Sequence, residues 1–490
     1  MRALAHLWQY GPLALCAQAA DPSITVSIVS TGDRREARPV NERRSVEQFD
    51  VVGAGLGPFN LSLAALLEPL SDLRARFFEA RSSFQWHCGI MVPGAELQVS
   101  FLKDLVTLAD PSSHFSFLNY LAHEGRLHRF LIAHADRCSR QEFELYYQWA
   151  ASQLESVRWN HRVERVELAA GGLAVSCSGG GSVTGSNLVL GSGREPWMPE
   201  FATKLRGDTV LHAAEFRTVR PSLRGRDVVV VGAGQSGAEV VNNLLSGELG
   251  LPRSLTWISS RLGILPLDDS PFSNEWFHPA YVDHFYGLSA ERRQELLSRQ
   301  RMASDGVSES LLREIYRRLY ELDTLRPGRM RHRLLVCRRL IDLLHDHGRL
   351  AATVHDEDTG GIETCEADVV ICATGYRSQF PEYLEPLRGR ILDSDGALRI
   401  RRDYSLEWDG PPELGIYVQN AAEGTHGVAD PNLSLAAWRS ARIVNSICGR
   451  TAYRIEGAPS TISWDGADPR PPDAPDQDLS TPPIAGVNVL

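Results

Sequence analysis

Apolar runs that end in a glycine-rich turn occur at two places along the chain, and a stretch with helical spacing follows each. The first is FDVVGAGLGPFNLSLAALL, which begins at Phe49, and the second is DVVVVGAGQSGAEVVNNLL at residues 227–245. Four consecutive valines in the second run are typical of a parallel strand buried on both faces. Another strand pattern comes after each helix, RARFFEA and then SLTWISSR. This order predicts two doubly wound α/β units.

Other patterns outline the segments around these units. Charged residues at helical spacing through residues 280–345 predict helices. ADVVICATGY at residues 367–376 predicts a buried strand and a glycine turn, which we interpret as the return of the chain to the first unit. GGGS at residues 179–182 predicts a hairpin or loop, because no helix pattern follows it.

The two ends of the chain have a different composition. Residues 1–48 are predicted to be an extended or disordered segment, and residues 31–48 in particular are polar. Residues 1–20 weakly resemble a signal peptide, although polar residues interrupt their apolar run. Residues 456–490 are rich in Pro, Asp, Ser and Thr, which predicts a disordered tail.

The overall composition is that of a soluble globular protein, with 43% hydrophobic and 23% charged residues. A formal net charge of −10 argues against nucleic acid or an anionic membrane surface as the main partner. No stretch reaches about 18 uncharged apolar residues, so no membrane span is predicted. None of the eight cysteines forms a CxxC pair, which disfavours a metal site and indicates reduced thiols and a cytoplasmic location.

The first glycine turn has the features of a dinucleotide site. Gly53 permits the tight turn, Gly55 lets the backbone approach a pyrophosphate, and the following helix offers its N-terminal N–H groups to the phosphates. Gly57 and Pro58 replace the last part of the usual G-x-G-x-x-G motif, and proline is tolerated in the first turn of a helix. Glu79 ends the next strand, where a carboxylate can bind a ribose diol.

The second turn matches G-x-G-x-x-G in full, with Gly232, Gly234 and Gly237. Its next strand ends in a hydroxyl and a guanidinium, Ser260 and Arg261, instead of an acid. A carboxylate there would repel a 2′-phosphate, whereas these groups would bind one, so the site favours NADPH over NADH. The two sites together indicate an enzyme in which a nicotinamide reduces a flavin.

Several blocks of the sequence resemble the lysine and ornithine side-chain N-monooxygenases of siderophore biosynthesis, from about Phe49 to Arg450. The first glycine motif shares the family's GxGxGP form. The other blocks are FQWHCGIMVPGAELQVSFLKDLVTLADPSSHFSFLNYL (84–121), LDDSPFSNEWFHP (267–279), ICATGY (371–376) and THGVADPNLSLAAWRSARIVN (425–445).

The resemblance implies a fold, two cofactors and a reaction. An FAD domain at residues 49–210 and 366–455 would be split by an NADPH domain with substrate-region helices at residues 211–365. FAD reduced by NADPH would form a C(4a)-hydroperoxyflavin with O2, which hydroxylates the terminal amine of a small basic metabolite. The amine must first lose its proton, because a lysine amine has a pKa of about 10.4. A homo-oligomer, dimer or tetramer, is also expected from the resemblance.

The matched motifs imply roles for individual residues. Lys103 and Asn274 correspond to family residues that contact the substrate, and catalytic and substrate-binding roles are predicted for both. Ser434 corresponds to a serine near the substrate. Trp86 and His87 lie in a motif next to the flavin, with packing as their alternative role. The predicted cofactor contacts are Gly53, Gly55, Gly57, Pro58, Glu79, Trp86, His87, Gln98, Gly232, Gly234, Gln235, Ser236, Gly237, Ser260, Arg261, Thr374 and Gly375.

The choice of substrate depends on one short stretch. SDGVSESLL after Ala303 resembles the lysine branch, since the ornithine enzymes usually carry an asparagine near this point and this chain has Ala303 or Ser304. L-Lysine is therefore the predicted substrate, and putrescine, cadaverine and L-ornithine are alternatives. An inactive nucleotide-binding relative is an alternative of another class. A flavin disulfide reductase would need a redox-active cysteine pair, and a Baeyer–Villiger-type oxygenase an FxGxxxHxxxW-like signature, and the sequence has neither.

Overall fold

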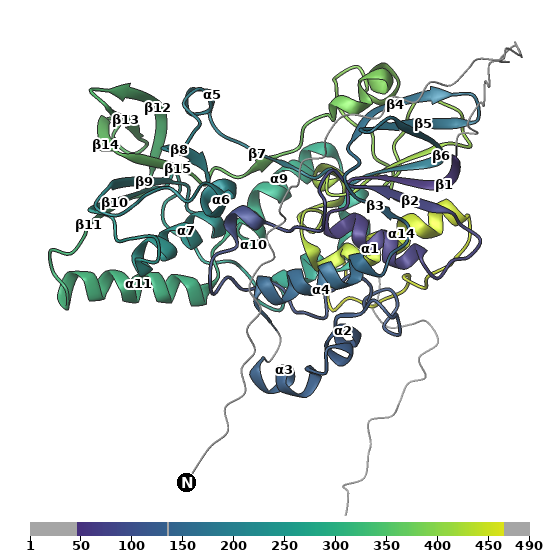
Figure 1. Ribbon diagram of the computed structural model, residues 1–490, viewed down its shortest axis with the longest axis horizontal. Coiled ribbons are helices and arrows are strands. Elements are labelled where there is room, and N and C mark those ends of the chain that lie inside the picture. The colour runs from purple at the N-terminus through teal and green to yellow at the C-terminus, as the bar shows by residue number, and fades with distance from the viewer. Residues whose placement is uncertain (1–46, 135–136, 465–490) are drawn as a thin grey trace, which may run out of the picture. The chain divides into compact units, whose positions relative to one another are not determined.

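A seven-stranded sheet forms around the first glycine turn, and the computed structural model describes residues 47–134 and 137–464. Its strand order is β3-β2-β1-β6-β5-β4 (Figure 1), and β17 pairs with β6. Strands β1, β2, β3, β6 and β17 pair with one another in parallel. On the other side, β4, β5 and β6 form an antiparallel meander. The strands are β1 (Glu47–Ala54), β2 (Ala75–Phe78), β3 (Val157–Arg158), β4 (Val163–Ala169), β5 (Gly172–Cys177), β6 (Gly181–Leu190) and β17 (Gly415–Val418).

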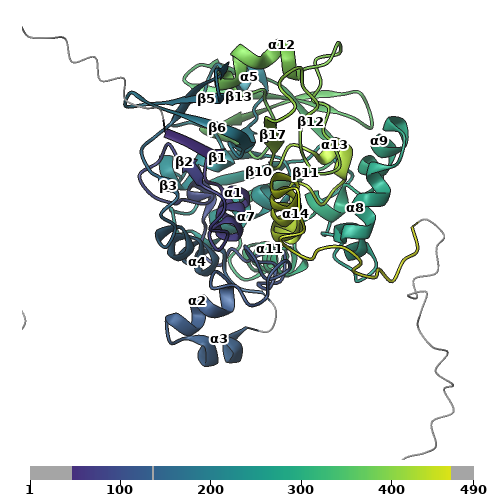
Figure 2. The same cartoon turned by 90° about the vertical axis from the view of Figure 1, so that its right-hand side faces the viewer.

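This first sheet confirms the strands predicted around the first turn, and the GGGS sequence makes the β5–β6 hairpin as predicted. Two helices, α1 (Pro58–Leu67) and α14 (Ala436–Cys448), pack against each other beside the sheet (Figure 2). Helix α1 buries every residue from Asn60 to Leu67, because its sequence is apolar on all sides. Serine side chains cap two further helices, α2 (Phe117–His123) and α4 (Arg140–Ser152), and α3 (Leu127–Ala133) follows α2.

The second glycine turn follows the central strand of a separate five-stranded parallel sheet. The strand order of this sheet is β11-β10-β9-β15-β8. Its strand β9 (Asp227–Val231) is buried along its whole length, as the run of valines predicted. The other strands are β8 (Val210–His212), β10 (Ser254–Ile258), β11 (Arg331–Leu335) and β15 (Val369–Cys372). Helices α7 (Gln235–Ser246) and α11 (Glu309–Thr324) pack together beside this sheet. Two Rossmann-like α/β units are therefore present, as predicted.

Strand β15 corrects the predicted path of the chain. Residues 367–376 were expected to return to the first sheet, but β15 pairs with β9 and β8 of the second sheet. Its four buried residues suit a central strand of either sheet, so their pattern alone does not choose between them. The chain then makes β16 (Tyr376–Arg377), which pairs with β7 (Glu195–Pro196), and it rejoins the first sheet only at β17.

The helices predicted for residues 280–345 are only partly present. Helices α8 (Pro279–Tyr286), α9 (Ala290–Arg299), α10 (Met302–Asp305) and α11 confirm the prediction, but the segment beyond them forms strands β11 and β12. A β-bulge in β12 places its two buried leucines, Leu340 and Leu343, three residues apart, which imitates helical spacing. The antiparallel sheet β12-β13-β14 consists of β12 (Arg338–Asp346), β13 (Arg349–Asp356) and β14 (Ile362–Ala367).

The segment 273–305, which the chain inserts between strands of the second sheet, packs into the core of the first. Phe277, Val282 and Ala303 are buried in the same cluster as β1, β6 and α14. Helices α8 and α9 contact α13 (Glu423–His426) (Figure 2). The Asp283 carboxylate accepts a hydrogen bond from Arg442 at 2.8 Å. These helices are the ones predicted to belong to a substrate region, and they pack on the core of the first sheet.

Residues 456–464, predicted to belong to a disordered tail, contact the folded part of the chain. Ser460 donates to the Glu275 carboxylate at 2.7 Å, and the Trp464 ring lies 4.6 Å from that of Tyr281. Predictions for residues 1–46 and 465–490 lie outside the described residues. In the part of the chain that is described, no helix is long and apolar enough to span a membrane. The remaining short helices are α5 (Glu200–Thr203), α6 (Phe216–Val219), α12 (Arg388–Ile391), η1 (Cys88–Ile90), η2 (Ala213–Glu215), η3 (Ser273–Phe277), η4 (Glu382–Leu387) and η5 (Leu433–Leu435).

Candidate active site

The first glycine turn has the shape that a pyrophosphate requires. Gly55 has a φ of +85°, and a Cβ built on it would lie 2.9 Å from the Gly191 carbonyl oxygen. At Gly53 a Cβ would come within 2.1 Å of the Phe77 ring. Both positions therefore need glycine, and Pro58 opens α1 directly after the turn. The residues present fit the pyrophosphate of FAD at the start of this helix.

Glu79 lies at the same turn, as the sequence predicted. One of its carboxylate oxygens accepts from the Leu56 N–H and the other from the Arg81 N–H, both at 2.9 Å. These two bonds fix the carboxylate next to the glycine loop, where a ribose diol would meet it. Gly57 caps α1 with extended backbone, and a Cβ there would meet nothing closer than 3.9 Å, so this glycine is not required by local packing.

The second turn packs closely against backbone atoms. A Cβ on Gly232 would lie 2.2 Å from the Ala373 carbonyl oxygen, and one on Gly237 would lie 2.1 Å from that of Gly232. Gly234 caps helix α7, and half-buried Ser236 lies in its first turn. This close packing of strand, turn and helix is the role expected of the third glycine in a dinucleotide motif. The turn therefore fits the pyrophosphate of NADPH.

A polar network connects the two predicted contact residues Gln98 and Gln235. The Gln235 side-chain oxygen accepts from Gln98 Nε2 at 3.2 Å and from the Ser308 N–H at 3.0 Å. Gln235 Nε2 donates to Glu239 at 2.8 Å, and Arg140 of α4 forms an ion pair with that buried carboxylate. Sequence reasoning missed Arg140 and Glu239, although the four-residue spacing from Gln235 places Glu239 on the same face of α7.

Arg261, the predicted ligand of the 2′-phosphate, has a carboxylate partner that the sequence did not reveal. Its guanidinium donates to the Asp305 carbonyl oxygen at 2.8 Å and lies 3.2 Å from the Asp305 side chain. Burial lowers the pKa of Arg261, while Asp305 opposes that effect. Arg261 is thus held at the end of β10, and Ser260 beside it is exposed. A bound 2′-phosphate would replace the Asp305 carboxylate as the partner of the Arg261 guanidinium.

Two of the predicted substrate residues meet although 331 positions separate them. Lys103 Nζ donates to Ser434 Oγ at 3.2 Å, and Ser434 Oγ donates in turn to Asn432 Oδ1 at 2.7 Å. Burial lowers the pKa of Lys103, and the charge of Arg137 lowers it further. The half-buried ammonium of Lys103 lies against η5, the short helix that carries Ser434, and it can bind an anionic group of a small molecule.

Asn274 is not hydrogen-bonded to this pair. It is exposed, and its side-chain amide donates to the Asp269 carbonyl oxygen at 2.9 Å. The loop that carries it is connected to the region of Lys103, because Asp269 forms a 2.9 Å ion pair with Arg137. The structure therefore places Asn274 on an adjoining loop, where its amide is hydrogen-bonded to Asp269 and not to Lys103 or Ser434.

Trp86 and His87 have different environments. The Trp86 ring packs against Tyr147 at 5.4 Å and Phe143 at 6.4 Å, and the backbone N–H of Trp86 donates to the Glu144 carboxylate at 2.8 Å. His87 is exposed and has left-handed backbone with a φ of 50°. Packing against these aromatic rings therefore explains the position of the Trp86 side chain, as the alternative interpretation held. Packing does not explain the left-handed backbone of the exposed His87.

Thr374 and Gly375 lie where the chain leaves the second sheet. Thr374 donates to the Trp197 carbonyl, and the Gly375 carbonyl accepts from the Trp197 N–H at 2.9 Å and from His212 Nε2 at 3.1 Å. Gly375 has a φ of +85°, which favours glycine. Because Ala373 packs on Gly232, these residues adjoin the second turn.

A buried ion pair supports the segment that ends at Ser434, and sequence reasoning missed it. Arg439 Nη1 donates to the Asp430 carbonyl at 2.7 Å and to its carboxylate at 2.5 Å. The other Asp430 oxygen accepts from the Ala422 N–H at 2.8 Å, and the guanidinium lies 4.2 Å from the Phe59 ring of α1. Within the described residues, Arg439 Nε and Nη2 have no hydrogen-bond partner.

The chain is similar to proteins of known activity over most of its length. The model of the L-lysine 6-monooxygenase/L-ornithine 5-monooxygenase family matches residues 47–378. The L-lysine N6-monooxygenase of Escherichia coli is 39% identical over 421 residues, which cover 85% of this chain and 99% of that protein.

Two solved structures share the arrangement of both sheets. The FAD-bound cadaverine monooxygenase of the desferrioxamine pathway from Erwinia amylovora is 31% identical, with a TM-score of 0.80 over 86% of this chain and 99% of that one. The ornithine N-hydroxylase of Kutzneria sp. 744, with reduced FAD, NADP+ and L-ornithine, is 33% identical, with a TM-score of 0.76 over 83% and 100%.

Proposed function

The chain belongs to the L-lysine 6-monooxygenase/L-ornithine 5-monooxygenase family, and from this premise we propose that it N-hydroxylates the terminal side-chain amine of L-lysine. It is an FAD- and NADPH-dependent monooxygenase, and the two glycine turns fit these cofactors. The observation that carries the choice of lysine is the pair of Lys103 and Ser434. Among residues 47–134 and 137–464, no carboxylate forms an ion pair with Lys103, so a substrate carboxylate would supply its counter-charge.

Different side chains bind the substrate and position its amine. Lys103 and Ser434 hold the carboxylate of the amino acid, and Asn274, on the adjoining loop, is a further substrate contact in this proposal. The bound flavin, once reduced by NADPH, supplies the activated oxygen. The protein positions the free amine and excludes water from the reacting atoms. Because the amine reacts through its lone pair, the substrate must lose a proton before the oxygen is transferred.

The relatives support a place in siderophore biosynthesis, where hydroxylated amines become hydroxamates. We propose this role for the chain, together with a cytoplasmic location and a homo-oligomeric state. A diamine is the second candidate substrate, because the Erwinia amylovora structure with its TM-score of 0.80 is that of a cadaverine monooxygenase. The two candidates differ in one chemical group, since cadaverine is lysine without its carboxylate.

The experiment measures NADPH oxidation and hydroxylamine formation with L-lysine, L-ornithine, cadaverine and putrescine. In the variant Lys103→Ala we expect the KM for lysine to rise about 10- to 100-fold, which is the loss of a charge-assisted hydrogen bond. The kinetics with cadaverine should change little. Lys204→Ala is the matched control, because Lys204 is an exposed lysine whose partner is Glu200 of α5.

Two results would contradict the proposal at different levels. Absence of hydroxylated product with all four amines would refute N-hydroxylation. An equal loss of activity toward lysine and cadaverine in Lys103→Ala would refute the carboxylate-binding role, and a preference of the wild-type protein for cadaverine would favour the second candidate.

A further inference from the structure

Two contacts join the core of the first sheet to helix α7 beside the second glycine turn. Gln98, which follows buried Leu97, donates through Nε2 to the Gln235 side-chain oxygen at 3.2 Å. Arg140, the first residue of α4, forms an ion pair with Glu239. Gln235 and Glu239 both belong to α7, and Gln235 Nε2 donates to the paired Glu239 oxygen at 2.8 Å. The four side chains therefore form one network that connects both α/β units.

Glu239 fixes the orientation of the Gln235 amide, which follows Gly234 in the second turn. A carboxylate only accepts hydrogen bonds, so it selects the NH2 end of the amide. The amide oxygen is then left to accept from Gln98 at 3.2 Å and from the Ser308 N–H at 3.0 Å. A neutral amide in place of the carboxylate could pair with either end of Gln235. The carboxylate therefore determines which polar groups meet at this turn.

Arg140 connects the same carboxylate to the segment that carries Gln98. The backbone N–H of Arg140 donates to the Ala95 carbonyl at 2.9 Å, and its Nε donates to the Glu96 carbonyl at 3.3 Å. These two carbonyls lie two and three residues before Gln98. Glu239 therefore acts on both sides of the amide pair, on one side directly and on the other through Arg140.

The stability of the fold does not explain this network. Arg140 places a positive charge in the first turn of α4, where the helix dipole disfavours one. Glu239 is buried, and its second carboxylate oxygen has no hydrogen-bond partner among residues 47–134 and 137–464. Burying an ion pair and leaving a buried polar atom unpaired both cost free energy of folding. Two such costs beside a nucleotide turn indicate a role in function.

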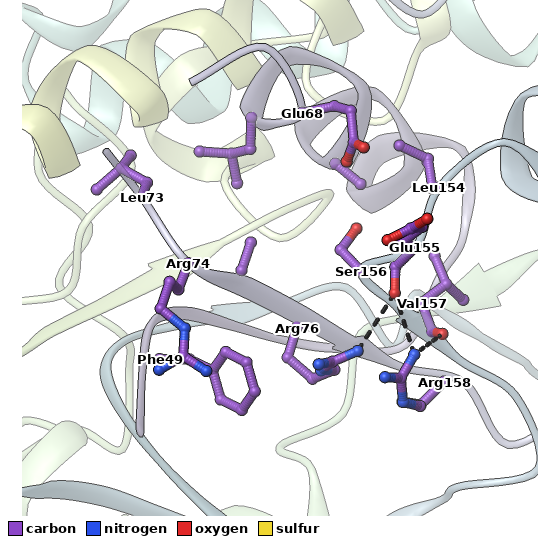
Figure 3. Close-up of a pocket in the computed structure, with 13 residues that line it drawn as sticks. Phe49, Glu68, Leu73, Arg74, Arg76, Leu154, Glu155, Ser156, Val157 and Arg158 are labelled. Atoms are coloured by element: carbon purple, nitrogen blue, oxygen red, sulfur yellow. Dashed lines mark hydrogen bonds between the residues drawn. The ribbon is translucent and has the colours of Figure 1, made fainter. Parts of the chain in front are cut away.

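Other arginines that donate to backbone carbonyls provide a contrast. Arg76 and Arg158 both donate to the Glu155 carbonyl oxygen, at 3.2 and 3.0 Å, in a cavity of about 560 Å³ (Figure 3). Arg158 is exposed, so water can replace its contacts. Arg140 makes the same kind of backbone contact but adds a buried carboxylate from the other sheet's helix, Glu239. Arg158 is therefore a suitable control for Arg140.

We infer that Glu239 is a positioning residue for the reduction of the flavin by NADPH. In this step NADPH gives one hydride, with its two electrons, to FAD, and the products are NADP+ and FADH−. Glu239 holds the Gln235 amide at the turn that fits the nucleotide and, through Arg140, the segment of Gln98 beside it. A small displacement of these amides lowers the rate of hydride transfer more than it lowers the affinity for the nucleotide.

The first experiment follows the flavin absorbance by anaerobic stopped flow with saturating NADPH. In Glu239→Gln we expect the rate constant of reduction to fall about 10- to 100-fold, because a displacement of about 1 Å can cost about 100-fold. Calorimetry of NADP+ with the FAD-loaded protein should give a Kd within about threefold of the wild-type value. No amine is present in either measurement, so the result is independent of whether lysine is the substrate.

NADPH deuterated at the transferred position separates positioning from general damage to the fold. If hydride transfer itself is slow in Glu239→Gln, reduction should keep a primary isotope effect at least as large as that of wild type. A slow variant without an isotope effect would overturn the inference, because another step would then limit reduction. Reduction within about threefold of the wild-type rate, or a Kd for NADP+ that rises as much as the rate falls, would also overturn it.

Glu248→Gln is the matched control for the carboxylate. Glu248 also accepts from an arginine and an amide, Arg217 at 2.9 Å and Asn243 at 2.7 Å, but it lies beyond the C-terminal end of α7. This variant should reduce at the wild-type rate. A loss equal to that in Glu239→Gln would overturn the inference, because any carboxylate of this helix would then have the same effect.

The double variant Arg140→Gln with Glu239→Gln removes both charges and leaves no unpaired charge in the interior. Its loss of reduction rate should be close to that of the slower single variant, because the two residues act as one unit. If Glu239→Gln does not retain FAD, the double variant decides the question, and a wild-type rate in it would overturn the inference. Arg158→Gln, at the cavity of Figure 3, should leave the rate unchanged.

Discussion

Replacing Arg439 with methionine would leave the Asp430 carboxylate charged and without its cation in the protein core. Both side chains are essentially inaccessible to solvent, at 2% and 0% exposure. Asp430 also accepts from the Ala422 N–H, and the guanidinium stacks on Phe59 at the start of α1. The ion pair therefore joins the loop before α14 to the helix that follows the first glycine turn. Methionine keeps most of the arginine side chain's volume and removes its charge.

The expected loss is large because the remaining charge cannot reach water. Removing one partner of a buried ion pair costs about 3–5 kcal/mol of the free energy of unfolding. For a unit of this size, 1 kcal/mol shifts Tm by about 2–4 °C, so Tm should fall by roughly 6–20 °C. Ser434 is four residues after Asp430, so the variant should also raise the KM for the amine substrate.

Thermal unfolding of the FAD-loaded protein, followed by circular dichroism, measures this loss. Combining Arg439→Met with Asp430→Asn removes the uncompensated charge and should recover a large part of the Tm, as expected for coupled residues. Arg450→Met is the control, because its exposed pair with Asp72 should contribute less than about 1 kcal/mol. A Tm within about 2 °C of wild type in Arg439→Met, or strictly additive effects in the double variant, would refute the reasoning.

Three further predictions test other parts of the site. Gly55→Ala should retain less FAD after purification, as measured by the visible absorbance of bound flavin. The left-handed backbone costs an alanine about 1–2 kcal/mol, and the alanine Cβ would crowd Gly191. Full retention of FAD would contradict the fit of this turn to the cofactor. Arg261→Gln should raise the KM for NADPH about tenfold or more and change that for NADH little, and equal effects on both nucleotides would contradict a 2′-phosphate contact. Burial lowers the pKa of His426 to about 4, below its ordinary value of 6.5, so the unfolded chain binds the extra proton. Stability is then complete above pH 6.5 and decreases toward pH 4 by up to about 3 kcal/mol; His426→Asn should flatten this dependence of Tm on pH, and an unchanged slope would contradict it.

Local sequence rules predicted the parts of the fold that are set by local geometry. The two glycine turns, the strands around them and the position of Glu79 follow from backbone conformation and close packing. The strand, the turn, the helix and the acidic residue lie within about 30 residues of one another, so a single sequence reveals them, whereas the contacts of Gly55 with Gly191 and of Gly232 with Ala373 are not visible there. The pairing of Lys103 with Ser434 could be expected only from the resemblance, since contacts across 331 positions leave no local pattern.

The predictions that the structure corrects, and the ion pairs that were missed, also have physical causes. Strand β15 is apolar on both faces, and such a strand suits the centre of either parallel sheet. In β12 a bulge changes the two-residue period into a three-residue spacing. Asp305 and Arg140 were not foreseen because an ion partner from a distant helix has no signature in the sequence near Arg261 or Glu239.

The path of residues 273–305 limits how the enzyme can be rebuilt by recombination. A chimera that exchanged the second sheet for that of a relative, in order to change nucleotide preference, would also exchange this segment. Phe277, Val282 and Ala303 would then be replaced in the core of the retained half, where they pack with β1, β6 and α14. Crossover points that respect the core therefore need to lie on both sides of this segment, so that it stays with the half it packs against.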